Sequence, residues 1–232
     1  MQLPSYWIPR PVFRPDRETT ASFDRLLDHA LDQGPEQPID YRLDAPKWQF
    51  LSRAAERADV VLHGSGNPDI GQFEPRQPAD TLEFSNRCAV FAATDGIWPM
   101  YYAILNRERH PTMMLCNACI RVISTTSGSR QLSDPYYFFS ISRPALEQQP
   151  WCTGTVYFLP ADSFEAQPPI ESSYVSVQTA QVASRESVKP AARISVHASD
   201  FPFLRQIRGH DDELLHARIA ADPDGFPWLA ED

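Results

Sequence analysis

Apolar side chains recur at helical spacing near the start of the chain. The pattern predicts an amphipathic helix over residues 20–33 that ends at Gly34-Pro35. A second helix is predicted over residues 44–57, with Pro46 in its first turn. Residues 1–18 alternate prolines with aromatic side chains, which predicts an extended arm that lies across a folded body.

After residue 57 the helical pattern gives way to short apolar runs. Residues 60–63 and 89–92 each predict a core strand that leads into a turn. Asp95 is placed to cap a helix whose apolar positions continue to Leu105. Five later strands are predicted at residues 118–123, 136–141, 155–159, 174–178 and 193–197. Short charged helices are expected at the end of the chain.

Helices followed by closely spaced strands favour an α+β fold with two mostly antiparallel β-sheets and the N-terminal helices packed on one side. A doubly wound parallel sheet is less favoured, because the strands follow one another too closely for regular crossover helices. We expect a single domain over residues 1–232. It divides into an arm with helices (1–57), a core (58–198) and a helical closure (199–232).

The composition is that of a folded globular domain, with 42% hydrophobic and 22% charged residues. A formal charge of -9 argues against non-specific nucleic-acid binding, because the overall field repels polyphosphate. The sequence shows neither an export signal nor an apolar stretch of membrane-spanning length, so we expect no membrane association and a cytoplasmic location.

Several metal-like patterns lack the partners that a metal site needs. Cys116 and Cys119 have the spacing of half a zinc site, but no second Cys/His pair follows at a usual distance. The segment from His210 to His216 is rich in potential ligands, yet a solvated charged helix face explains it better. We therefore expect no metal, and reduced, mostly buried cysteines.

His63-Gly64-Ser65 stands at the end of a predicted core strand. A glycine there lets a planar ligand approach the backbone, whose N–H and C=O can pair with a carboxamide. The imidazole and the hydroxyl would then be available to ribose hydroxyls. The alternative interpretation is a plain turn with a histidine satisfied by the protein. A lipase-like reading fails, because the sequence contains no Gly-x-Ser-x-Gly elbow.

A second motif follows. Val90-Phe91-Ala92 leads through a turn into a helix that carries Tyr101. Together, the two motifs resemble the His-Tyr-Glu class of ADP-ribosyltransferases, the poly(ADP-ribose) polymerase group and its bacterial relatives. The resemblance covers roughly residues 58 to 198. It implies an NAD-binding cleft between the two sheets and NAD as the substrate.

The resemblance also implies roles for individual residues. His63 would bind a ribose, Gly64 would hold the nicotinamide amide and Tyr101 would stack on its ring, with Tyr102 as the alternative aromatic. Arg76 could pair with the pyrophosphate, although an exposed loop arginine without a ligand fits the sequence equally well. The alternative for Tyr101 is a core residue, since it lies on the apolar face of its predicted helix.

At the third position the sequence departs from the family, whose members place a glutamate at the start of a late strand. Our first choice is Gln181, followed by Glu186 and Glu171. A glutamine can bind a ribose hydroxyl but cannot accept its proton. The expected function is mono-ADP-ribosyl transfer from NAD to an unknown protein, nucleic-acid or small-molecule acceptor. The alternative is an inactive NAD- or ADP-ribose-binding or protein-interaction module on the same fold.

Overall fold

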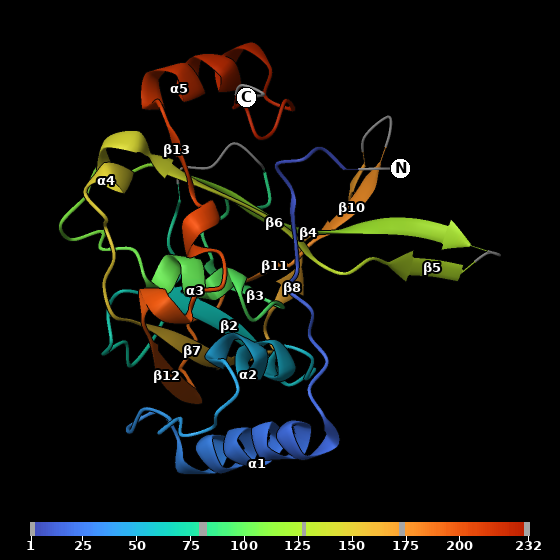
Figure 1. Ribbon diagram of the computed structural model, residues 1–232, viewed down its shortest axis with the longest axis vertical. Helices are drawn as coiled ribbons and strands as arrows, with labels where there is room; N and C mark the ends of the chain where they lie inside the picture. Colours follow the sequence, from blue (N-terminus) through green and yellow to red (C-terminus); the bar gives the residue numbers. More distant parts are fainter. Residues whose placement is uncertain (1–2, 79–82, 127–128, 172–174, 230–232) are drawn as a thin grey trace.

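Two β-sheets form the centre of the computed structural model, which describes residues 3–78, 83–126, 129–171 and 175–229. Almost all neighbouring strands are antiparallel, and helices pack around the sheets, so the expected α+β class is confirmed. Figure 1 shows α1 (Arg17–Gln33) and α2 (Lys47–Ala54) toward one end of the long axis and α5 (Asp212–Ala221) at the other.

The first sheet has the order β1-β6-β4-β10-β9, with β5 paired to β4 and β13 paired in parallel to β6. Its strands are β1 (Ile8–Pro9), β4 (Leu115–Thr126), β5 (Ser129–Leu132), β6 (Tyr136–Ser142), β9 (Ile170–Glu171), β10 (Ser176–Thr179) and β13 (Arg208–His210). The predicted N-terminal arm enters this sheet, because Ile8 pairs with Tyr137 of β6.

The second sheet has the order β12-β7-β2-β3-β11-β8. Its strands are β2 (Val60–Ser65), β3 (Val90–Ala93), β7 (Gly154–Pro160), β8 (Glu165–Ala166), β11 (Gln181–Ser184) and β12 (Ala192–Val196). The chain crosses from the first sheet to the second at Ala180, between β10 and β11.

The two N-terminal helices and the helix after β3 pack against the second sheet, whereas the two later helices pack against the first. They are α1 (Arg17–Gln33), α2 (Lys47–Ala54), α3 (Trp98–Ala103), α4 (Arg143–Glu147) and α5 (Asp212–Ala221), with 3-10 turns η1 (Ala198–Asp200) and η2 (Leu204–Gln206). Helix α1 begins earlier than expected because Asp16 caps it, its Oδ1 accepting from Thr19 N at 2.7 Å. Helix α2 is shorter than the predicted 44–57.

The main hydrophobic core lies on one face of the second sheet, where α1, α2, α3 and the first sheet meet it. Side chains alternate along β2: Leu62 joins this core, whereas Val61 belongs to a smaller cluster on the opposite face. The same alternation separates Val156 and Phe158 of β7 from Tyr157. The two faces of this sheet are therefore distinct environments.

Helix α3 rests directly on the backbone of β2 and β7. A Cβ at Gly64 would lie 1.7 Å from Pro99 O, and one at Gly154 would lie 1.8 Å from Ala103 O. Only glycine permits this approach. The two glycines thus fix which face of the sheet α3 covers.

Two expectations about strands need correction. The strand predicted at 118–123 extends over Leu115–Thr126, and β11 was not expected at all. The strand predicted at 174–178 is found as Ser176–Thr179, while Tyr174 lies outside the described residues. The C-terminal part contains β13 as well as helices.

Candidate functional site

His63 lies on the face of the second sheet opposite to α3. Its ring centroid is 4.6 Å from that of Phe73, and its strand partner is Tyr157; both belong to the small cluster on that face. Nδ1 is 2.6 Å from Phe91 O, so it carries a proton that it donates to this carbonyl. Burial lowers the pKa of His63 below its usual 6.5, and the nearby charge of Arg76 acts in the same direction. The imidazole is therefore neutral, with Nε2 as an acceptor.

The backbone N–H and C=O of Gly64 point to the side of β2 on which β3 lies, at the point where the two strands diverge. Phe158 O accepts from Ala191 N, so the peptide groups of Phe158 face β12. Its strand partner Leu62 therefore directs its own N–H and C=O toward β3, and Gly64, two residues further, has the same orientation.

Strand β3 does not continue alongside Gly64. Among the described residues, β2 and β3 pair only at Leu62 and Ala93, while β2 pairs with β7 along its whole length. The carbonyl of Phe91 in β3 is taken by the His63 imidazole instead. Gly64 is also partly exposed. It therefore offers one donor and one acceptor, side by side, at an edge where no partner strand continues within the described ranges.

Ser65 and the residues after it form an ordered turn. Ser65 Oγ accepts from Asn67 N at 3.1 Å, and Tyr157 OH donates to Asn67 O at 2.7 Å. The same phenol oxygen accepts from Ile70 N at 3.0 Å. The Ser65 hydroxyl thus stabilises the turn, and its own proton can still be donated to a ligand.

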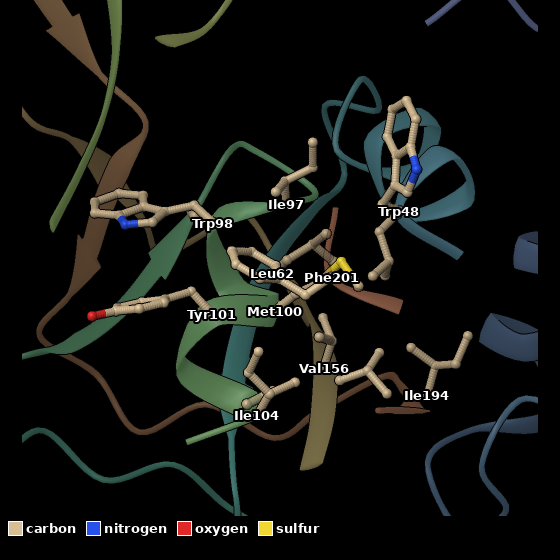
Figure 2. Packing of buried hydrophobic residues seen from close by; sticks show 14 of the residues in the cluster. Trp48, Leu62, Ile97, Trp98, Met100, Tyr101, Ile104, Val156, Ile194 and Phe201 are labelled. Atoms are coloured by element: carbon tan, nitrogen blue, oxygen red, sulfur yellow. The ribbon is translucent and has the colours of Figure 1, made fainter. Parts of the chain in front are cut away.

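Tyr101 is a core residue. It is 0% exposed, its hydroxyl donates to Ser140 O at 2.9 Å, and its ring lies 4.8 Å from that of Phe139. Burial raises the pKa of Tyr101 well above its usual value. Figure 2 shows its ring projecting from α3 beside Trp98, away from Trp48 and Ile194.

The structure does not bring Tyr101 and His63 together. Tyr101 belongs to the core on the α3 face of β2, whereas His63 lies on the opposite face. The reason is that α3 packs directly against Gly64, which places the whole helix on the other side of the sheet from the imidazole. The slot expected between these two side chains is not formed.

Tyr102 is less buried than Tyr101, and its hydroxyl donates to Asn117 Oδ1 at 2.8 Å. The indole of Trp98 donates to the same oxygen at 2.6 Å, so Asn117 links α3 to β4. Tyr102 is therefore the more accessible aromatic of the pair, but it too comes from the α3 face.

Gln181 begins β11, where the resemblance would place the catalytic acid. It pairs with Ala93, which pairs in turn with Leu62, so the three lie in one row across β11, β3 and β2. Strands are about 4.8 Å apart, which puts the backbones of Gln181 and Leu62 about 10 Å apart. The side-chain oxygen accepts from Ser85 Oγ at 3.1 Å. Residues in one row share a face, so Gln181 lies on the α3 side.

The two glutamates considered as alternatives lie further away. Glu186 is exposed and follows β11, at the end opposite to Gln181. Glu171 is exposed on β9 of the first sheet and accepts from Ser176 Oγ at 2.7 Å. Of the three candidates, only Gln181 lies within β11, two strands from β2 in the second sheet.

Arg76 is exposed, and its backbone exchanges two hydrogen bonds with Ala89, both of 3.1 Å. Its charge contributes to the lowered pKa of His63, so the guanidinium lies close enough to act on the imidazole. A pyrophosphate-binding role for Arg76 stays a prediction.

A buried serine, histidine and aspartate were not expected to meet. Ser140 Oγ is 2.6 Å from His210 Nδ1, and His210 Nε2 is 3.3 Å from Asp212 Oδ1. Ser140 is 0% and His210 2% exposed, so no substrate reaches this hydroxyl and the group connects β6, β13 and α5. The assignment of His210 to a solvated face was wrong, because strand β13 carries it into the interior.

No group of three or more His, Cys, Asp or Glu side chains within the described residues is arranged to hold a metal ion. The four cysteines are thiols. No helix in the described ranges is both long and apolar enough to cross a membrane.

Comparison of the chain with protein-family models, with curated proteins and with solved structures gives no match.

Proposed function

We propose that the chain binds NAD, with the carboxamide of its nicotinamide held by the backbone of Gly64, in the manner of ADP-ribosyltransferases. The proposal rests on one observation: the N–H and C=O of Gly64 point toward the edge of β2 along which β3 is no longer paired. A primary carboxamide has a donor and an acceptor side by side, and so does this edge.

Two side chains near this edge suit the rest of the ligand. The neutral imidazole of His63 presents Nε2 as an acceptor for a ribose hydroxyl. The exposed guanidinium of Arg76, whose charge acts on His63, suits a pyrophosphate.

Binding without rapid turnover fits the residues better than efficient transfer. The start of β11 carries the neutral amide of Gln181, which cannot accept a proton from a ribose hydroxyl. Tyr101, the expected stacking residue, is enclosed in the core. An NAD-binding module is therefore the first proposal.

A nuclear magnetic resonance titration tests this proposal directly. His63-Gly64 is the only His-Gly pair in the sequence. Protein labelled with ¹³C-carbonyl histidine and ¹⁵N-glycine therefore gives a single signal for the Gly64 amide in a carbonyl-selected spectrum. Adding NAD or nicotinamide should shift this signal in a saturable manner.

The control ligand is nicotinic acid, whose carboxylate lacks the N–H needed by the Gly64 carbonyl. The control signal is the Gly34 amide at the end of α1, seen in the ¹⁵N-glycine spectrum. A Gly64 amide signal that does not shift with NAD or nicotinamide, or that shifts equally with nicotinic acid, would refute the proposal.

Mono-ADP-ribosyl transfer to an unknown acceptor is the second candidate. It is favoured by the row that joins Gln181 to Ala93 and Leu62, because this is where a catalytic acid would face the ligand edge. Incubation with labelled NAD and a cell lysate tests it. Absence of both label transfer and nicotinamide release would exclude it.

A further inference from the structure

A cavity of about 350 Å³ lies where the N-terminal arm, α2, β4 and the turn from β3 to α3 meet. Its walls include Arg10, Arg121, Ser52 and Thr94. The volume is at the lower end of the range for small-molecule sites. Thr94 follows Ala93, the last partner of β2 on β3, whereas Gly64 lies on the other side of that pair. The cavity is therefore separate from the Gly64 edge.

Three polar atoms on this wall have no hydrogen-bond partner among the described residues. Arg10 Nε and Nη2 and Ser52 Oγ are buried, and none of them makes a hydrogen bond in the part of the chain that is described. Ser52 is only 3% exposed. Buried donors are nearly always paired, so three such atoms on one cavity point to a missing acceptor.

The guanidinium of Arg10 is held in place by an aromatic ring. Its central carbon lies 4.6 Å from the ring centroid of Phe13, and its backbone N donates to Pro135 O at 3.0 Å. Stacking covers a face of the guanidinium and leaves its N–H groups at the edge, in the plane where an oxyanion binds.

The acids nearby already have partners. Asp95 Oδ1 accepts from Ile97 N at 2.9 Å and from Trp98 N at 2.7 Å, and Oδ2 accepts from Tyr137 OH at 2.7 Å.

Glu56, at the cavity wall, is held by Arg53 Nη1 at 2.9 Å. Among the described residues, neither Arg10 nor Arg121 forms an ion pair with these acids. Burial raises the pKa of Cys119, and both guanidiniums oppose that rise, so the charges of the two arginines act on the same region.

We propose that this cavity binds the phosphate group of a small phosphorylated molecule, a phosphomonoester or a diphosphate. Arg10 and Arg121 pair with the phosphate oxygens, and Ser52 Oγ donates a hydrogen bond to one of them. Guanidinium groups match phosphate oxygens in geometry as well as charge. The cavity volume leaves space for the organic part of the ligand beside the phosphate.

Calorimetry and thermal denaturation at fixed ionic strength, with inorganic phosphate and pyrophosphate as probes, test the proposal. Wild-type protein should bind pyrophosphate and melt at a higher temperature in its presence. Arg10→Gln and Arg121→Gln should each weaken pyrophosphate binding at least tenfold. Arg130→Gln, which removes an exposed arginine of β5, is the matched control and should leave binding unchanged.

Ser52→Ala separates ligand binding from a structural role. It removes a buried hydroxyl without a partner, so the ligand-free protein should be no less stable, while pyrophosphate affinity should fall.

Arginines that serve only the fold would give variants with lower melting temperatures but an unchanged shift on adding pyrophosphate. That result, or wild-type protein that binds neither probe, would overturn the proposal. Nicotinamide carries no phosphate, so the nicotinamide titration of Gly64 tests the proposed NAD site independently of phosphate binding in this cavity.

Discussion

Tyr101→Phe is the substitution that best separates a core role from a ligand-stacking role. The change keeps the aromatic ring and its contact with Phe139, and removes the hydroxyl that donates to Ser140 O. Because Tyr101 and Ser140 are both fully buried, water cannot replace the lost donor. The Ser140 carbonyl would be left without this partner.

The size of the effect follows from this burial. Leaving a buried acceptor unsatisfied costs about 1–3 kcal/mol. For a chain of this length, each kcal/mol corresponds to a change in melting temperature of about 2–4 °C. We therefore expect Tyr101→Phe to lower the free energy of unfolding by about 1–3 kcal/mol. NAD binding should be unchanged, because Tyr101 lies on the opposite side of the sheet from His63.

Urea denaturation measures the stability change, and calorimetric titration with NAD measures the binding. Tyr102→Phe is the matched control, since its less buried hydroxyl bonds Asn117 at the surface of α3. A Tyr101→Phe protein with wild-type stability and clearly weaker NAD binding would refute the assignment of Tyr101 to the core.

Three further predictions follow from the site. Gln181→Glu supplies the missing acid and should raise the rate of nicotinamide release from NAD by about 10²-fold or more, as general bases do; an unchanged rate in an assay of released nicotinamide would count against transfer chemistry at β11. Gly64→Ala should destabilise the fold severely, because its Cβ would collide with the backbone of α3, whereas Gly71→Ala, with open space around it, should be nearly neutral in thermal denaturation. The pKa values of His63 and His210 are lowered by burial, so the unfolded chain binds protons that the folded chain does not, and stability should fall as the pH drops below about 6.5. A urea-denaturation series from pH 7.5 to 5 measures this fall. His210→Gln should flatten the profile, and an unchanged profile would show that the buried His210 imidazole is not its source.

Much of the fold could be predicted from local patterns. Helix α1 and strands β2, β6 and β7 have clear apolar periodicity or runs, and their positions were anticipated within a few residues. Strand β11 was missed because Gln-Val-Ala-Ser has a weak pattern of its own, and becomes a strand through its pairing with β3.

The relation between His63 and Tyr101 could not be derived from local pattern. Each residue lies on the element that was predicted for it, yet the helix could pack on either face of β2. The choice is made by Gly64 and Gly154, which let α3 approach the sheet from one side only. The sequence does not predict the cavity at Arg10 and Arg121 for a similar reason, since no motif connects residues so far apart in sequence.

Because α3 packs directly on the backbone of β2, the helix should respond to a ligand bound at the Gly64 edge. With no side chain between Gly64 and the carbonyl of Pro99, there is no soft layer to absorb a displacement of the strand. A ligand that fastens the Gly64 edge should therefore slow hydrogen exchange at the amides of α3, at a distance from any atom that it touches.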